Sequence, residues 1–154
     1  MVTYPLLLRK GILIFQVFEL SQETISKLII SAQGTQKLRT LKGRTGLTPN
    51  ILARIALMIS LNERDQPVSG QYSVDGMEFN AYTLFGELED LLLCLLKENN
   101  LLKATTEESM QDNVRGHIER GIEIIYPRIK SLADIGLLVA SDSKKSKPES
   151  TSIG

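Results

Sequence analysis

The segment from Lys37 to Leu61, KLRTLKGRTGLTPNILARIALMISL, contains the signals that decide the fold. Gly46 is suited to end a helix, because glycine readily adopts the left-handed conformation found just past a helix C-terminus. Thr48 and Pro49 then form a helix start, an N-cap followed by proline at the first helical position. We therefore predict two helices joined by a tight turn at Gly46. The second runs through Ile59, is apolar over most of its circumference, and is expected to be buried.

The residues before this segment predict a strand and the beginning of the first helix. Gly11–Leu20 (GILIFQVFEL) is apolar on both alternating faces and rich in β-branched and aromatic residues, as in a short, covered strand. Ser21 follows as a helix N-cap, and past Gly34 the apolar stripe changes register, which predicts a kink or break near that glycine. The stripe of this predicted helix consists of Ile25, Leu28, Ile29 and Ala32.

The residues after the segment predict a loop, further helices and a tail. Asn62–Asn80 is rich in Gly, Pro, Ser and Asp, which is typical of an ordered surface loop. Lys144–Gly154 is rich in Ser, Pro and Lys, which predicts disorder. We predict a single helical domain over residues 1–140 and a disordered tail over residues 141–154. The further helices are predicted over Tyr82–Lys97, about Thr106–Tyr126 and about Pro127–Ile135.

Together these elements predict a mainly α fold, in which a short N-terminal strand is followed by a helical bundle. A strand followed by two helices is also the order of elements in ribbon-helix-helix proteins, where paired strands read the major groove and a helix N-terminus grips a phosphate. The predicted strand is poorly suited to reading bases, because only Gln16 and Glu19 carry polar side-chain groups. Sequence-specific recognition of DNA is therefore not expected.

The bulk composition is that of an ordinary soluble globular protein. The chain has 154 residues, of which 42% are hydrophobic and 23% charged, and its formal net charge is zero. One cysteine excludes an internal disulfide framework and a cysteine-based zinc site. The early apolar run Gly11–Phe18 is only eight residues long and includes Gln16, so no membrane span is expected. The N-terminus does not match a signal peptide, and we predict a cytoplasmic protein.

The zero net charge hides a strong asymmetry along the chain. Met1–Ser60 contains eight Lys and Arg against two acidic residues, a balance of +6. Leu61–Met110 contains three Lys and Arg against ten acidic residues, a balance of −7. The opening segment has no acidic residue, and such a separation attracts polyanions to one face of a protein. Its five cations are Lys37, Arg39, Lys42, Arg44 and Arg54.

The spacing of these cations suggests that they bind phosphate. Lys37 and Arg44 are seven residues apart and lie within about 20° of each other on one flank of the apolar stripe. Arg39 and Lys42 lie on the other flank, so cations line both edges of the exposed surface and could follow a phosphate backbone. The helix start Thr48-Pro49-Asn50 offers free backbone N–H groups to an anion. A solvated charged face is the competing interpretation.

Candidate catalytic groups are few. His117 is the only histidine and is expected to be exposed or hydrogen-bonded in a structural role. Cys94 lies in LLLCLLK, where a buried thiol is expected. Glu87, Glu89 and Asp90 lack the spacing of a metal site and are expected on the solvated side of a helix. We predict no catalytic residue, no metal and no cofactor.

Large apolar side chains are more numerous in Tyr82–Lys97 than one buried stripe requires. Leu84, Leu88, Leu91 and Leu95 share one face, and further apolar residues lie beside it. Two accounts fit: all of them are buried in the core of the monomer, or some remain for contacts between subunits. The residues beside the first face are Phe85, Leu92 and Leu96.

Two blocks of sequence closely resemble the DndE family, a component of bacterial DNA phosphorothioation systems. They are Leu38–Glu63 (LRTLKGRTGLTPNILARIALMISLNE) and Asp75–Glu87 (DGMEFNAYTLFGE), and a weaker similarity continues in Arg115–Ile125 (RGHIERGIEII). The resemblance implies a small, mostly helical DNA-binding subunit with a fold related to ribbon-helix-helix proteins. It also implies a tetramer, a preference for nicked duplex, and work beside a cysteine desulfurase, an iron–sulfur protein and an ATPase.

The resemblance makes the cations of the basic helix the expected DNA contacts. Arg54 lies in a largely apolar helix and could instead form a structural ion pair. We therefore predict a non-catalytic subunit that grips double-stranded DNA by its phosphate backbone. The alternative is a scaffold that docks the sulfur-transfer enzymes through the acidic, leucine-rich half of the chain. The expected DNA-binding residues are Lys27, Lys37, Arg39, Lys42, Arg44, Thr48 and Asn50.

Overall fold

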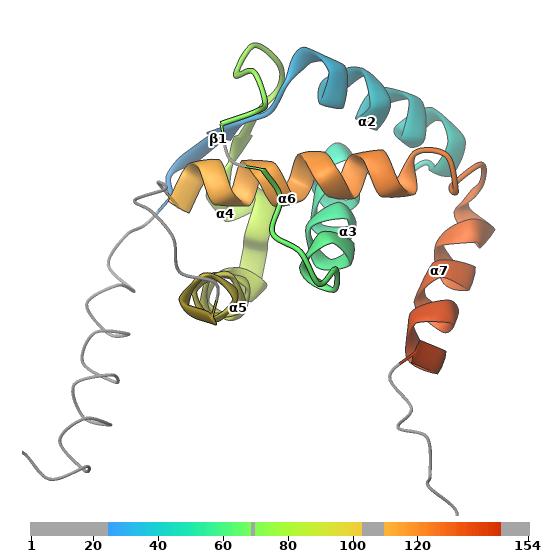
Figure 1. Cartoon of the computed structure of the whole chain (residues 1–154). Helices are drawn as coiled ribbons and strands as arrows, with labels where there is room; N and C mark the ends of the chain where they lie inside the picture. The colour runs from blue at the N-terminus through green and yellow to red at the C-terminus, as the bar shows by residue number, and fades with distance from the viewer. Residues whose placement is uncertain (1–24, 69, 103–109, 146–154) are drawn as a thin grey trace, which may run out of the picture.

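The fold is mainly helical, with one short two-stranded sheet (Figure 1). A computed structural model describes residues 25–68, 70–102 and 110–145. The predicted strand Gly11–Leu20, the cap Ser21, the predicted helix start at Thr106 and most of the predicted tail lie outside them. The elements in chain order are β1 (Lys27–Ile29), α2 (Ala32–Thr45), α3 (Pro49–Leu61), β2 (Glu78–Asn80), α4 (Ala81–Phe85), the 3-10 turn η1 (Gly86–Leu88), α5 (Glu89–Leu102), α6 (Met110–Ile125) and α7 (Leu132–Lys145).

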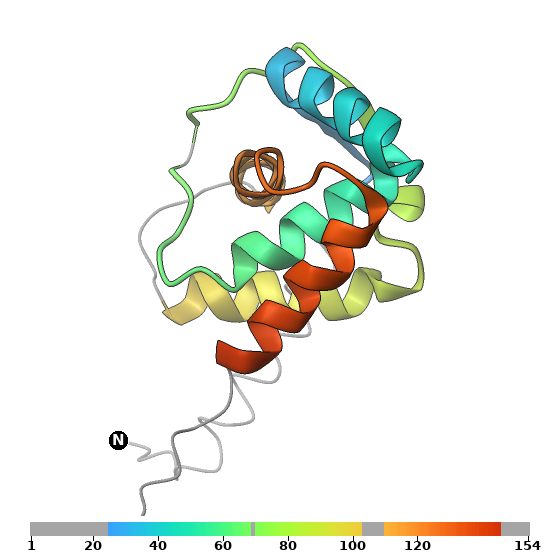
Figure 2. The same cartoon turned by 90° about the vertical axis from the view of Figure 1, so that its right-hand side faces the viewer.

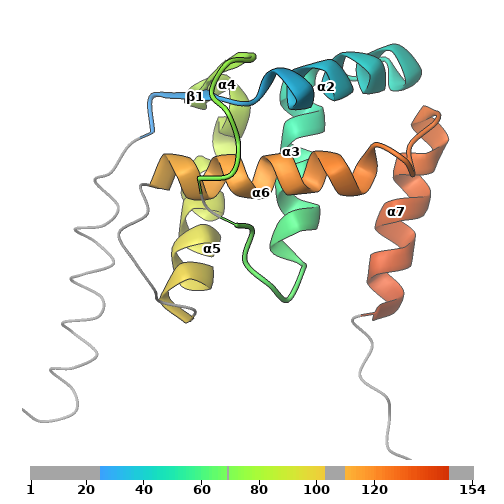
Figure 3. The same cartoon turned by 45° about the horizontal axis from the view of Figure 1, so that its top comes forward.

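Helix α6 crosses α3 at close range, and this contact is the most extensive between any two elements (Figures 1 and 3). A Cβ atom placed on Gly121 of α6 would lie 1.9 Å from the carbonyl oxygen of Ala56 in α3, so only glycine permits this approach. Leu57, Ile118 and Ile122 are fully buried at the crossing. Viewed along α6, α2 lies on one side of it and α3 on the other (Figure 2). Helix α6 is therefore central to the fold.

The sheet joins a strand of the basic half of the chain, Met1–Ser60, to a strand of the acidic stretch Leu61–Met110. Strand β1 pairs antiparallel with β2, with Lys27 opposite Asn80 and Leu28 opposite Phe79. The helix predicted through Ile25, Leu28 and Ile29 is therefore wrong. The loop predicted over Asn62–Asn80 is wrong for its last three residues, Glu78–Asn80, which form β2. Local spacing gave a helical stripe, but Leu28 is instead buried against a strand some fifty residues away, which no local signal could reveal.

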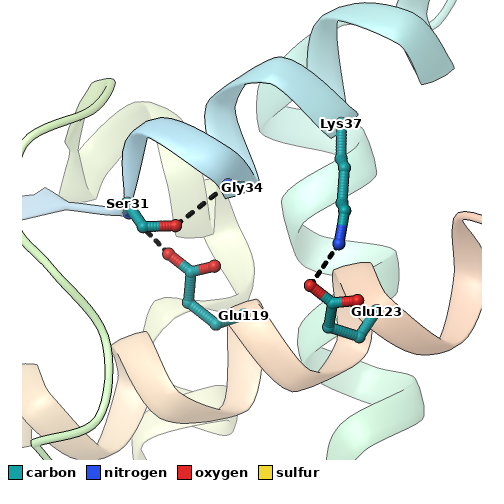
Figure 4. A network of polar contacts seen from close by, with 5 residues as sticks. All are labelled: Ser31, Gly34, Lys37, Glu119 and Glu123. Atoms are coloured by element: carbon teal, nitrogen blue, oxygen red, sulfur yellow. Dashed lines mark hydrogen bonds and ion pairs between the residues drawn. The ribbon is translucent and has the colours of Figure 1, made fainter.

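Helix α2 begins at the N-cap Ser31, whose hydroxyl accepts a hydrogen bond from Gly34 N–H at 2.9 Å. The kink predicted near Gly34 is wrong, because that glycine lies inside the first turn of a continuous helix. The carboxylate of the buried Glu119 accepts a hydrogen bond from Ser31 N–H at 2.5 Å (Figure 4). The carboxylate of Asp75 accepts one from Ala32 N–H at 2.9 Å. Two carboxylates of the chain itself thus occupy the positive end of α2.

The signals between α2 and α3 are confirmed. Gly46 has a φ of 76° and caps α2, with its N–H donating to Lys42 O at 2.8 Å. Thr48 is the N-cap of α3 and Pro49 its first residue. The predicted burial of α3 holds for one face, whereas Ile51 and Met58 are exposed. The buried residues of α3 are Leu52, Ala53, Ala56, Leu57 and Ser60.

The helix predicted over Tyr82–Lys97 is interrupted. Gly86 adopts a φ of 56° and ends α4, after which one 3-10 turn leads into α5. The guanidinium of Arg54 donates to the carbonyl oxygens of Leu84 and, at 2.9 Å, Thr83. Arg54 therefore satisfies the C-terminal carbonyls of α4, in place of the structural ion pair expected for it.

The last helix lies further along the chain than predicted. Residues 127–131, which were expected to be helical, form a turn. Helix α7 continues to Lys145 and so crosses residue 140, where the domain boundary was predicted. That boundary stays a prediction. Asp134 accepts from the N–H of Lys130 and of Ser131, each at 2.8 Å, which fixes the start of α7. No helix in the described ranges is long and apolar enough to cross a membrane.

The relation to ribbon-helix-helix proteins is not confirmed. Paired strands in that class come from two subunits, whereas β1 pairs with β2 of the same chain. The mainly α class with a short strand ahead of the helices is confirmed, although the described strand is Lys27–Ile29.

We expect Gly121→Ala to destabilise the protein by at least about 2 kcal/mol, because its Cβ would overlap backbone rather than a movable side chain. Gly136→Ala in α7 is the matched control, since the new methyl group would meet no neighbouring atom of the described chain within 4 Å. That change should leave stability unchanged or raise it by up to about 1 kcal/mol. Urea unfolding midpoints measure both, and equal midpoints for the two variants would contradict the close crossing.

The capping of α2 predicts a dependence of stability on pH. The hydroxyl of Ser73 and the N–H of Ala32 lower the pKa of Asp75 below its ordinary value. A carboxylate whose pKa is lowered on folding stabilises the fold at pH values above its unfolded-state pKa of about 3.9. That stabilisation is lost as the pH falls through the folded-state pKa. Asp75→Asn should therefore unfold at lower urea than the parent at pH 7, and this deficit should shrink as the pH falls below the unfolded-state pKa of about 3.9. A deficit constant with pH would show that the carboxylate charge is not involved.

Candidate nucleic-acid interface

The two flanks of the basic helix have different surroundings. As predicted, Lys37 and Arg44 lie on one side of α2, and Arg39 and Lys42 on the other. The first flank faces α6. Lys37 Nζ forms an ion pair with Glu123 Oε1 (Figure 4), and the Lys37 side chain is only 17% exposed. Its Nζ also lies 5.6 Å from the centre of the Tyr126 ring. The expectation that Lys37 is unpaired is therefore wrong.

Arg44 is also engaged within the protein. Its Nη1 donates to the carbonyl oxygens of Tyr126 at 3.1 Å and Ile129 at 3.2 Å. The guanidinium carbon lies 4.8 Å from the centre of the Tyr126 ring, a cation–π arrangement. These carbonyls follow the C-terminus of α6, where a cation is favoured by the helix dipole. Arg44 thus holds the end of α6 against α2.

Lys27 is exposed but paired. Its Nζ lies 2.9 Å from Oε1 of Glu78 on the adjacent strand, and both side chains are about half exposed or more. Exposed pairs of this kind contribute about 0–1 kcal/mol. The charge of Lys27 is therefore offset, although the pair can open at little cost.

Arg39 and Lys42 form the exposed flank. Both are exposed, and neither makes a side-chain hydrogen bond or ion pair to any described residue. The outer surface of α2 around them is uncharged and polar, with Gln33, Gln36 and Gly43 also exposed. Two cations with no carboxylate among their neighbours on the helix are suited to a polyanion.

The N-terminus of α3 lies next to this flank, because only Gly46 and Leu47 separate the last residue of α2 from its N-cap. Thr48 makes no side-chain capping bond, and the first turn of α3 contains no acidic residue. The first N–H groups of a helix lack partners within it, including that of Asn50. In contrast to α2, this helix start is not covered by a carboxylate of the described chain, so an anion can approach it.

His117 and Cys94, both considered for catalysis, differ in their burial. His117 is fully buried, and its Nδ1 lies 3.1 Å from the hydroxyl of Ser60. Cys94 is exposed, so the prediction that it is buried is wrong. Within the described ranges, no three His, Cys, Asp or Glu side chains are grouped as metal ligands.

The leucine-rich helix is divided between core and surface. Leu84, Phe85, Leu92 and Leu96 are buried, while a second set on the same helical region is exposed. This division favours the account in which some leucines remain available for contacts with other molecules. The exposed set is Leu88, Leu91 and Leu95, with 43%, 56% and 43% exposure.

The sequence reasoning missed two exposed cations, Arg128 and Lys130, in the turn between α6 and α7. The predicted helix Pro127–Ile135 includes them, although Pro127, two residues after α6 ends at Ile125, signals a turn at this point. Arg44 holds this turn near the end of α2.

Comparison with known proteins identifies the family. The family model described as DNA sulphur modification protein DndE matches residues 27–132. A crystal structure of DndE from Escherichia coli B7A, involved in DNA phosphorothioation modification, is 27% identical, has a TM-score of 0.56, and aligns over 66% of this chain and 97% of that one. No curated protein matches.

A second structure, a DndE G21/24K mutant involved in DNA phosphorothioation, is 22% identical and supports the fold alone. Its TM-score is 0.54, and it aligns over 68% of this chain and 99% of that one. Because the family model matches more than half of the sequence, this chain belongs to the DndE family.

The two flanks of α2 should differ in their effect on stability. Arg44→Gln removes two hydrogen bonds from a charged donor and should cost about 1.5–3 kcal/mol of unfolding free energy. Arg39→Gln, on the exposed flank, should change it by less than about 0.5 kcal/mol. Urea unfolding of both variants checks this, and equal losses would mean that Arg44 does not join α2 to α6.

Proposed function

We propose that this member of the DndE family serves in DNA phosphorothioation, in the cytoplasm, as a DNA-binding subunit without catalytic activity of its own. The family membership of this chain, and its similarity to an E. coli DndE involved in DNA phosphorothioation modification, support a role in that process. The single observation that carries the binding role is the exposed flank of α2, on which Arg39 and Lys42 have no partner among the described residues.

The proposed mechanism is contact with the phosphate backbone and not with bases. Arg39 can form two parallel hydrogen bonds to one phosphate, whereas Lys42 acts as a compact point charge. Each contact releases condensed counterions from the DNA, which favours binding at low salt. A further phosphate can lie against the N-terminus of α3, where Thr48 and Asn50 supply polar side chains and backbone N–H groups. This mode predicts little dependence on DNA sequence.

The remaining predicted contacts have a supporting role in this proposal. Lys37 and Arg44 orient α2 by holding it against α6, so their removal would disturb the surface without removing a contact to DNA. Lys27 can reach DNA only if its pair with Glu78 opens, which costs little.

A homo-oligomer is part of the proposal. The exposed leucines Leu88, Leu91 and Leu95, in η1 and α5, are suited to contact between subunits, and family resemblance favours a tetramer. Several copies of the basic flank would raise the avidity for a long polyanion without new contacts. A preference for nicked duplex and work beside a desulfurase, an iron–sulfur protein and an ATPase belong to the same proposal.

One observation favours a second function, a scaffold that docks the sulfur-transfer enzymes. The leucine face of α5 is bordered by the exposed carboxylates of Glu87 and Asp90, which is suited to a partner with apolar and basic groups. In this alternative, contact with DNA is incidental.

The double variant Arg39→Gln and Lys42→Gln tests the proposed function. If each side chain contacts one phosphate, the slope of log K against log salt should become less steep by about 0.9 per contact, or about 1.8 in total. Fluorescence anisotropy of the full chain with short intact and nicked duplexes, across a NaCl series, measures this slope. Arg64→Gln, at an exposed arginine after the opposite end of α3 that makes interactions of its own within the protein, is the comparison for removal of a positive charge away from the proposed surface.

The loss should be the same for duplexes of different sequence. An unchanged slope in the double variant would contradict the proposed binding surface. A flattened slope combined with full DNA phosphorothioation in cells would favour the scaffold, because the modification would then not require this contact.

A further inference from the structure

The turn between α6 and α7, residues 126–131 (YPRIKS), lies beside the C-terminal end of α2 (Figures 1 and 2). These segments are about eighty residues apart in the sequence, and both hydrogen bonds between them come from Arg44 Nη1. The turn is therefore placed beside the C-terminal end of α2, on the side that carries Arg44, by tertiary contacts alone.

The turn is held in one conformation by several contacts. The N–H groups of Arg128 and Ile129 both donate to Ile125 O, at 3.0 and 2.9 Å, and continue the end of α6. The side chain of Ile129 is fully buried. Arg44 binds the carbonyls of Tyr126 and Ile129, on either side of Arg128. A backbone fixed at these points presents its side chains in defined directions.

Two cations project from this fixed turn. Arg128 and Lys130 flank the buried Ile129, and both are exposed, with no side-chain hydrogen bond or ion pair to a described residue. The acid beside them is Asp134, whose carboxylate accepts the backbone N–H groups of Lys130 and Ser131. These backbone bonds, and to a smaller degree the charge of Lys130, lower the pKa of Asp134.

Glu123, two residues before the end of α6, is the other nearby acid and is paired with Lys37. Both neighbouring carboxylates thus have partners of their own, and neither neutralises the guanidinium of Arg128. The turn therefore adds positive charge at the end of α2 where the chain enters α3, on the side of α2 that carries Arg44.

We propose that Arg128 and Lys130 form the second half of the DNA-binding surface, in which Arg39 and Lys42 form the first half. Arg44 is the positioning residue that joins them, because it reaches from α2 to the carbonyls of the turn. This inference rests on the proposed function. Two pairs of cations on separate elements can contact phosphates that lie further apart along a duplex than the phosphates within reach of the α2 pair alone.

The double variant Arg128→Gln and Lys130→Gln tests the inference. The slope of log K against log salt for duplex DNA should become less steep by about 1.8, as for Arg39→Gln and Lys42→Gln, and by about 3.6 in the quadruple variant. Urea midpoints should stay at the parent value, because both side chains are exposed and unpaired among the described residues. Arg64→Gln again serves as the comparison.

The outcomes separate the two proposals. A flattened slope for Arg39→Gln and Lys42→Gln, with an unchanged slope for Arg128→Gln and Lys130→Gln, would overturn the inference and leave the proposed function standing. Unchanged slopes in both double variants would overturn both.

The role of Arg44 is tested by a mutant cycle. As a positioning residue, Arg44→Gln should flatten the slope in the parent but add nothing once Arg128 and Lys130 are replaced. A further decrease of about 0.9 in that background would identify Arg44 as a direct phosphate contact and overturn its positioning role.

Discussion

The close crossing of α6 over α3, possible only because Gly121 has no side chain, determines where the rest of the structure lies. With the backbones in contact at Ala56, α6 passes beneath α2 and aligns its own side chains along it. Glu119 then meets the N-terminus of α2, Glu123 meets Lys37, and the end of α6 meets Arg44. A wider separation of α3 and α6 would lose all three contacts.

Several charged side chains among the described residues stabilise the ends of helices. Arg120 donates to Ser60 O at 2.6 Å near the end of α3, as Arg54 does for α4 and Arg44 for α6. Carboxylates occupy the opposite positions, with Glu119 at the start of α2 and Asp134 at the start of α7. Because these groups satisfy backbone atoms that have no partner within their helices, they are not available to a ligand.

This use of charge defines the surface that remains for binding. The cations without a partner among the described residues include Arg39 and Lys42 on α2 and Arg128 and Lys130 on the neighbouring turn. They surround the point where α2 ends and α3 begins. In the proposed function, the exposed leucines of η1 and α5 contact other copies of the subunit, while this basic surface contacts DNA.

The sequence by itself determined the mainly α class, the family, the ends of α2 and α3 at Gly46, Thr48 and Pro49, and the division of the basic helix into two flanks. Capping and helical spacing are local properties, so a single segment suffices to predict them. Only the tertiary structure decided that β1 is a strand, where the local spacing predicted a helix. It also decided that Lys37 is paired while Arg39 has no partner among the described residues, and that Arg128 lies beside α2. These outcomes depend on contacts between residues some fifty to ninety positions apart, and the energy of such a contact is absent from the local pattern of either segment.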